Sequence, residues 1–99
     1  MSGTNTTPGA NFETFAKTVP TGTAEAIGAS SSSRVAYGIL VKALRSNTVS
    51  VYIGGSVAMT TSTGIELGPG ESITVPLPDP SKVFCISGSA SQGVRYGFV

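Results

Sequence analysis

The chain has 99 residues, enough for one domain with a single modest core, and we expect no second domain. Charged residues make up 11% of the sequence and the net charge is +1, whereas about 25% is typical of globular proteins. A net charge this close to zero gives no positive electrostatic potential that would attract nucleic acid or an anionic membrane surface. A surface rich in Ser, Thr and Gly instead favours packing against other protein.

The chain contains no histidine and a single cysteine. Without histidine the usual general base and the commonest transition-metal ligand are missing, so a Ser-His-Asp or Cys-His arrangement cannot form within one chain. Cys85 alone can form neither an internal disulfide nor a structural zinc site, and its apolar neighbours predict a buried, inert thiol. We therefore expect no enzymatic activity, no cofactor and no metal.

Residues 1–10 consist mainly of Ser, Thr, Asn, Gly and Pro, which predicts a disordered tail unless a partner holds it. This end of the chain has no basic region followed by an apolar stretch, so we expect no secretory signal. No apolar run approaches the ~20 residues that a membrane helix needs. The sequence therefore predicts no membrane association.

Phe12, Phe15 and Val19 are large apolar residues in the otherwise polar segment 1–20. Their spacing could mark one face of a helical turn, but Phe15, Lys17 and Val19 also alternate as on a strand, which we favour. One hypothesis is an extended N-terminal arm that docks on a neighbouring subunit, for example by adding a strand to an exposed sheet edge. The alternative, to which we give equal weight, is that this segment is the first strand of the chain's own sheet.

Residues 21–99 predict one domain of short strands separated by turns rich in Gly, Pro and Asp. Residues 37–45 are the longest strand candidate. Because both faces of this strand would be fairly apolar, it should be a central strand of its sheet. Residues 49–53 alternate, so that Ser50 and Tyr52 share one face. Further strand candidates are residues 23–28, 65–67, 71–75, 82–87 and 93–99.

Gly68-Pro69-Gly70 predicts a tight turn between two of these strands. Glu66 and Glu71 flank the turn and could face each other across a hairpin. Paired carboxylates serve glycosidases and calcium sites, but nothing aromatic surrounds these two in sequence, and we expect ordinary solvated side chains. The prolines at 76, 78 and 80 cannot donate ladder hydrogen bonds and belong to an edge or a loop.

The alternation of apolar with small or polar residues predicts an all-β fold, a small antiparallel β-sandwich. The cations do not form a run. Arg34, Lys42, Arg45 and Arg95 are scattered along the sequence, so we expect no nucleic-acid partner.

Several segments together resemble one family. These are Val41-Lys-Ala-Leu, Val51-Tyr-Ile-Gly-Gly, residues 63–73, Lys82-Val-Phe-Cys-Ile and Val94-Arg-Tyr. Over about residues 36–98 the chain resembles small virion proteins of tailed bacteriophages, of the head decoration or cement type. The resemblance implies a jelly-roll-like sandwich, often a homotrimer, on the capsid exterior, with terminal arms that reach across neighbouring capsomers. It implies no catalytic residues.

We therefore expect a virion structural protein, made in the cytoplasm of a host bacterium, that cements the capsid by multivalent contacts with the lattice of the major capsid protein. The residues expected at its protein interface are Phe12, Phe15, Val19 and Tyr52. One alternative is a tail, neck or fibre component of the virion, present in few copies. Another is a glycan-binding module, against which the absence of tryptophan and the few amide side chains argue.

Overall fold

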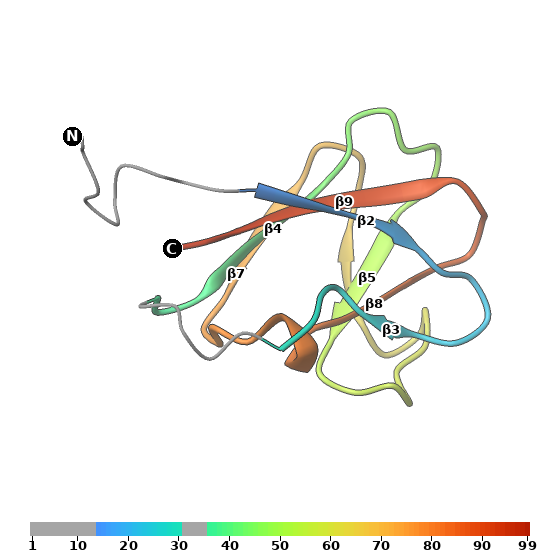
Figure 1. The fold of residues 1–99 in the computed structure, drawn as a ribbon. Coiled ribbons are helices and arrows are strands. Elements are labelled where there is room, and N and C mark those ends of the chain that lie inside the picture. Colours follow the sequence, from blue (N-terminus) through green and yellow to red (C-terminus); the bar gives the residue numbers. More distant parts are fainter. Residues whose placement is uncertain (1–13, 31–35) are drawn as a thin grey trace.

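The structure is a computed structural model, and it describes residues 14–30 and 36–99. The strands in this part of the chain form two antiparallel sheets (Figure 1). They are β2 (Thr14–Val19), β3 (Glu25–Ala26), β4 (Ile39–Ala43), β5 (Val51–Gly54), β6 (Ile65–Leu67), β7 (Ser72–Val75), β8 (Phe84–Ser87) and β9 (Gln92–Phe98), with a 3₁₀ helix, η2 (Pro80–Lys82). The expected all-β, antiparallel fold is confirmed.

The strands pair in a nested order. Sheet one has the order β2-β9-β4-β7, and sheet two has the order β3-β8-β5-β6. β5 pairs with β6, β4 with β7, β3 with β8 and β2 with β9, so the chain resembles one long antiparallel ribbon folded over on itself. Because its outer pairs join segments far apart in sequence, local sequence patterns do not specify them.

The core lies between the two sheets and follows the period of two expected of strands. On β4, Ile39, Val41 and Ala43 are fully buried, whereas Lys42 between them is exposed. Val51 and Ile53 face them from β5 in the same apolar cluster. A buried Val or Ile side chain contributes about 1.5–3 kcal/mol relative to an exposed one, so these positions supply much of the stability of the sandwich.

β4 is a central strand, as predicted, because β9 pairs with one side of it and β7 with the other. The strand is shorter than the expected residues 37–45, and Tyr37, which the prediction included in the strand, is 90% exposed. The chain at Tyr37 has passed the end of β4, where its backbone N–H donates to the Val99 carbonyl at 2.7 Å. Beyond that end of the sandwich, none of the described strands covers the ring.

Part of the N-terminal segment belongs to sheet one. β2 runs antiparallel to β9, with Thr14 opposite Gly97 and Val19 opposite Gln92. Of our two hypotheses for this segment, residues 14–19 adopt the strand of the chain's own sandwich. Phe12 lies outside the described residues.

The turn predicted at Gly68-Pro69-Gly70 is present, and Gly70 has a φ of 85°, a left-handed conformation that favours glycine. It does not form the hairpin that we considered for Glu66 and Glu71. β6 before the turn pairs with β5, and β7 after it pairs with β4. The turn therefore carries the chain from sheet two to sheet one.

Two buried amide side chains fix the connection between β4 and β5. Asn47 Nδ2 donates to the Gly93 carbonyl at 3.0 Å, and Asn47 Oδ1 accepts from the Gly93 N–H at 2.9 Å. Gln92 Oε1 accepts from the backbone N–H groups of Thr48 and Val49, at 2.8 and 3.2 Å. We call this group of hydrogen bonds the amide clamp. It ties the corner after β4 to the corner before β9.

Replacing Asn47 by Ala should lower the free energy of unfolding by about 2–3 kcal/mol, because it leaves the N–H and C=O of Gly93 without their side-chain partner at a partly buried site. Urea denaturation measures the loss. Ser89→Ala, at an exposed loop position, is the control and should change stability by less than about 0.5 kcal/mol. Equal stabilities of the two variants would show that the clamp does not hold this corner.

Candidate interaction surfaces

In the described part of the chain, no three His, Cys, Asp or Glu side chains lie close enough together to hold a metal ion. None of the helical segments described there is long and apolar enough to span a membrane. Glu66 and Glu71, which we considered as a pair, have separate partners. Glu66 Oε2 accepts from the Ser50 hydroxyl at 2.6 Å, and Glu71 Oε1 accepts from the Gly68 N–H at 2.6 Å. The idea that they face each other across a hairpin is wrong, because their strands belong to different sheets.

Cys85 is a core residue with no exposed surface, as predicted. Burial raises the pKa of its thiol to about 11, an effect that Lys17 opposes and Glu25 reinforces. The thiol is therefore protonated at neutral pH. Since the thiolate is the reactive form, this geometry supports the inert thiol that we expected.

Lys17 and Glu25 link the two sheets at one side of the sandwich. Lys17 Nζ on β2 lies 2.6 Å from Glu25 Oε1 on β3. Because both side chains are partly exposed, this ion pair contributes about 0.2–1 kcal/mol. It pairs a cation of sheet one with a carboxylate of sheet two.

Three of the four residues predicted for a protein interface lie in the described part of the chain, and they are placed apart from one another. Phe15 is half-buried and packs on Tyr96 and Phe98, with ring centroids 5.2 and 6.1 Å away. Val19 is in the core, where it offers little surface to a partner. Tyr52 is half-buried on the opposite sheet. The structure therefore does not bring these residues together into one patch.

The outer face of sheet two is covered by the chain itself. Met59, in the connection between β5 and β6, is buried against Ile86 and Ala24, with Tyr52 packed at the margin. A Cβ atom at Gly54 would lie 2.6 Å from Met59 Sδ. Glycine at this position thus makes room for the methionine, and most of this apolar face is not open to a partner.

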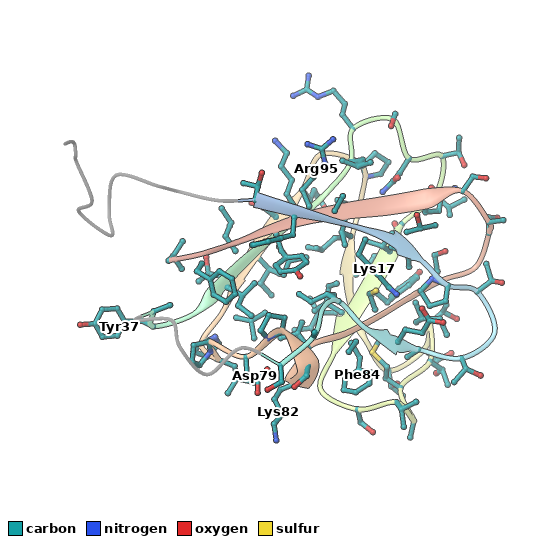
Figure 2. The ribbon with its side chains drawn as sticks, in the orientation of Figure 1. Lys17, Tyr37, Asp79, Lys82, Phe84 and Arg95 are labelled. Atoms are coloured by element: carbon teal, nitrogen blue, oxygen red, sulfur yellow. The ribbon has the colours of Figure 1, made fainter. Side chains whose placement is uncertain are left out.

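Three of the five exposed large apolar side chains among the described residues lie at one end of the sandwich, which we call the apolar end. It comprises Tyr37, Leu77 and Val99, which are 90%, 43% and 46% exposed. Tyr37 is hydrogen-bonded to Val99 through the backbone, and a Cβ atom at Gly38 would lie 2.4 Å from the Val75 carbonyl, so the three residues lie at the ends of adjacent strands. Figure 2 shows Tyr37 pointing away from the body of the molecule. Sequence reasoning missed this patch.

The outer face of sheet one is exposed, among the described residues, at Ala16, Lys42, Arg95 and Ser72, and we call it the cationic face. Cross-strand partners in an antiparallel sheet project from the same face. One row of partners contains Ala16, Arg95, Lys42 and Ser72, and the next contains Thr14, Gly97, Leu40 and Thr74. Arg95 and Lys42 are directly opposite each other, so the fold places side by side two cations that are scattered in the sequence.

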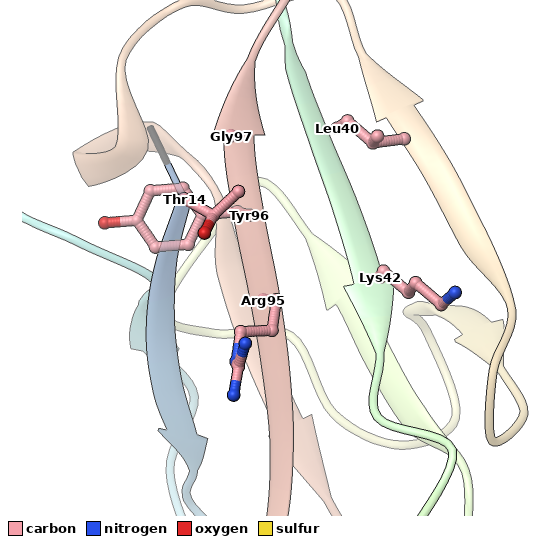
Figure 3. Close-up of a pocket in the computed structure, with 6 residues that line it drawn as sticks. All are labelled: Thr14, Leu40, Lys42, Arg95, Tyr96 and Gly97. Carbon is pink, nitrogen blue, oxygen red and sulfur yellow. The ribbon is translucent and has the colours of Figure 1, made fainter. Parts of the chain in front are cut away.

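A shallow, open depression of about 140 Å³ lies in the cationic face. It is lined by Thr14, Leu40, Lys42, Arg95, Tyr96 and Gly97 (Figure 3). Leu40 and Lys42 project from the same side of β4. Gly97, which has no side chain, lies between Thr14 and Leu40, its cross-strand partners on either side.

The raised pKa of Cys85 predicts a pH dependence of stability. The folded thiol stays protonated up to about pH 11, whereas an exposed thiol ionises near the ordinary value of 9.0. This group therefore stabilises the fold fully below pH 9, and its contribution is lost as the pH rises towards 11.

The difference in unfolding free energy between the wild type and Cys85→Ala should shrink from pH 9 to pH 11. Comparison with this variant removes the titration of tyrosine and lysine side chains from the result. In the wild type at pH 8, a thiol reagent should label Cys85 slowly in the native state and rapidly in denaturant. Rapid native labelling would contradict the assigned burial.

Comparison of this chain with protein-family models, with curated proteins and with solved structures finds no match.

Proposed function

We propose that this protein is a non-enzymatic structural component of a bacteriophage virion, which decorates the capsid exterior and cements it. The observation that carries the proposal is the apolar end, where Tyr37, Leu77 and Val99 are exposed together. Exposed apolar groups that cluster rather than scatter are a feature of protein interaction sites. The resemblance of the sequence to phage decoration proteins directs the proposal to a capsid.

The strand order supports a jelly-roll identification of the sandwich. Its two four-stranded sheets contain the nested pairs β2–β9, β3–β8, β4–β7 and β5–β6. Double-sheet jelly rolls occur in viral capsid domains and also in lectins. The topology is therefore compatible with a virion protein, while the apolar rather than polar character of the exposed end favours protein over glycan as the partner.

Cementing follows from several modest contacts rather than one strong one. A single end formed by Tyr37, Leu77 and Val99 is small for a stable protein interface, which buries about 800 Å² per partner. A homotrimer would present three such ends, and linked sites gain avidity without a new contact. Tyrosine suits this role, because its rigid ring buries a large area and loses little conformational entropy.

Quantitative mass spectrometry of purified phage particles tests the assignment. A cement protein should be present in copy numbers comparable with those of the major capsid protein. A few copies per particle would identify a tail, neck or fibre component, and absence from particles would refute a virion role. Light scattering should give a mass near three times that of the chain if the protein is a trimer.

Replacing Tyr37 by Ser should weaken attachment to particles at least about tenfold, as expected for an aromatic anchor. Because Tyr37 is 90% exposed, the substitution should change the free energy of unfolding of the protein little. Val57→Ser, a second exposed apolar position in the β5–β6 connection, is the matched control and should bind like the wild type. Pelleting assays with labelled protein measure the difference, and equal binding of both variants would exclude the apolar end from the interface.

A further inference from the structure

The cationic face carries positive charge that the described part of the chain does not balance. Lys42 and Arg95 are cross-strand partners. Two like charges directly opposite each other destabilise a strand pair. Ala16 and Ser72 flank them in the same row and carry no charge. Among the described residues the one ion pair joins two other side chains, one on each sheet.

Glu71, the acidic residue beside Ser72 in the chain, is engaged elsewhere. Glu71 precedes Ser72 on the neighbouring strand, but its carboxylate accepts from the Gly68 N–H at 2.6 Å and is engaged by the turn. Lys42 and Arg95 are both exposed. Two cations thus face outward together on a face where none of the described residues carries a carboxylate.

We propose that the outer face of sheet one, centred on Lys42 and Arg95, is a docking surface for carboxylate side chains presented by a partner protein. This inference rests on the proposed function, because it identifies the chemistry of the surface to which the protein attaches. The Arg95 guanidinium can bind a carboxylate through two parallel hydrogen bonds, and the Lys42 ammonium adds a second charge. Leu40 provides an apolar contact for the stem of a Glu or Asp side chain.

The shape of the face favours a side chain on a protein surface over a free small molecule. The depression has a volume of about 140 Å³ and is open, whereas sites that enclose small ligands span about 300–1,000 Å³. Gly97 forms part of its lining between Thr14 and Leu40. A protruding carboxylate side chain could enter this space while the surrounding flat strands contact the rest of the partner.

The charge of the face favours carboxylates over nucleic acid. A nucleic-acid site usually tracks many phosphates with an extended basic stripe. Here the outward positions of the flanking strands β2 and β7 contribute Ala, Ser and Thr instead of further cations. Two cations on an otherwise neutral face suit one or two carboxylates.

The cationic face is continuous with the apolar end. Gly97 on β9 is two residues before Val99, which follows the strand. Leu40 on β4 is three residues after Tyr37, which precedes the strand. A partner that covers the apolar end therefore also reaches the cationic face. The combined surface has an apolar part with a charged margin, as protein interfaces commonly have.

Titration of the ¹⁵N-labelled full chain with a deca-glutamate peptide tests the proposal by NMR. At low salt, the peptide should shift the backbone amide signals of Lys42, Arg95 and Gly97, and the effect should weaken with added salt. The double variant Lys42→Gln/Arg95→Gln should bind the peptide about tenfold more weakly. Lys82→Gln is the control for Lys42→Gln, since it removes an exposed lysine elsewhere, and it should change affinity less than about twofold.

The proposal would be overturned by shifts that map to another surface, by unchanged affinity of the double variant, or by an equal loss of affinity in Lys82→Gln. Deca-thymidylate or inorganic phosphate that binds the same face as tightly as the peptide would also overturn it, because recognition would then be of any anion. The spectra of the variants report directly whether they remain folded.

The single variants Lys42→Gln and Arg95→Gln provide the same comparison if the double variant is unstable. The peptide titration needs no phage particle, so its failure leaves the virion proposal standing. Conversely, absence of the protein from particles would leave peptide binding by this face intact.

Discussion

The two corners at which the chain passes between the sheets, after β4 and before β9, are hydrogen-bonded to each other. Asn47 from the first corner pairs with both backbone groups of Gly93, and Gln92 from the second accepts from the backbone of Thr48 and Val49. Buried amide side chains whose hydrogen bonds are all made favour one arrangement of the chain around them. Any other arrangement would leave a buried donor or acceptor without its partner, at the full cost of removing that group from water. The clamp therefore fixes how the folded-over ribbon closes, and with it the position of β4 beside β9.

That position decides what the surface of sheet one presents. With β4 and β9 in this register, Val41 and Tyr96 face the core, while Lys42 and Arg95 face outward. A shift of one residue would reverse both faces, since successive side chains of a strand alternate. The open cationic face and the buried core are thus two consequences of the same pairing.

The outer faces of the two sheets differ in how far they are covered by the described chain. Sheet two carries apolar residues outside, and its own β5–β6 connection covers them through Met59, with Gly54 and Gly64 leaving the space for that side chain. The described outer residues of sheet one are mainly small, polar or cationic, and most of them are exposed. This exposed face is the one that we propose for a partner.

Some properties of this protein follow from its sequence alone. The alternation along residues 39–43 and the glycines of the Gly68–Gly70 turn determined an all-β fold, a central β4 and a tight turn, because these signals are local. The apolar neighbours of Cys85 likewise indicated a buried thiol. The pairing of strands was decided only by the tertiary structure, because period-two alternation shows that a residue lies on a strand but not which strand lies beside it. For that reason the sequence suggested a hairpin around Gly68–Gly70 and a central strand that included Tyr37, and it gave no sign that Lys42 and Arg95 are neighbours. In the structure Tyr37 lies beyond the end of β4 and is exposed, and the pairing of β4 with β9 brings the two cations together.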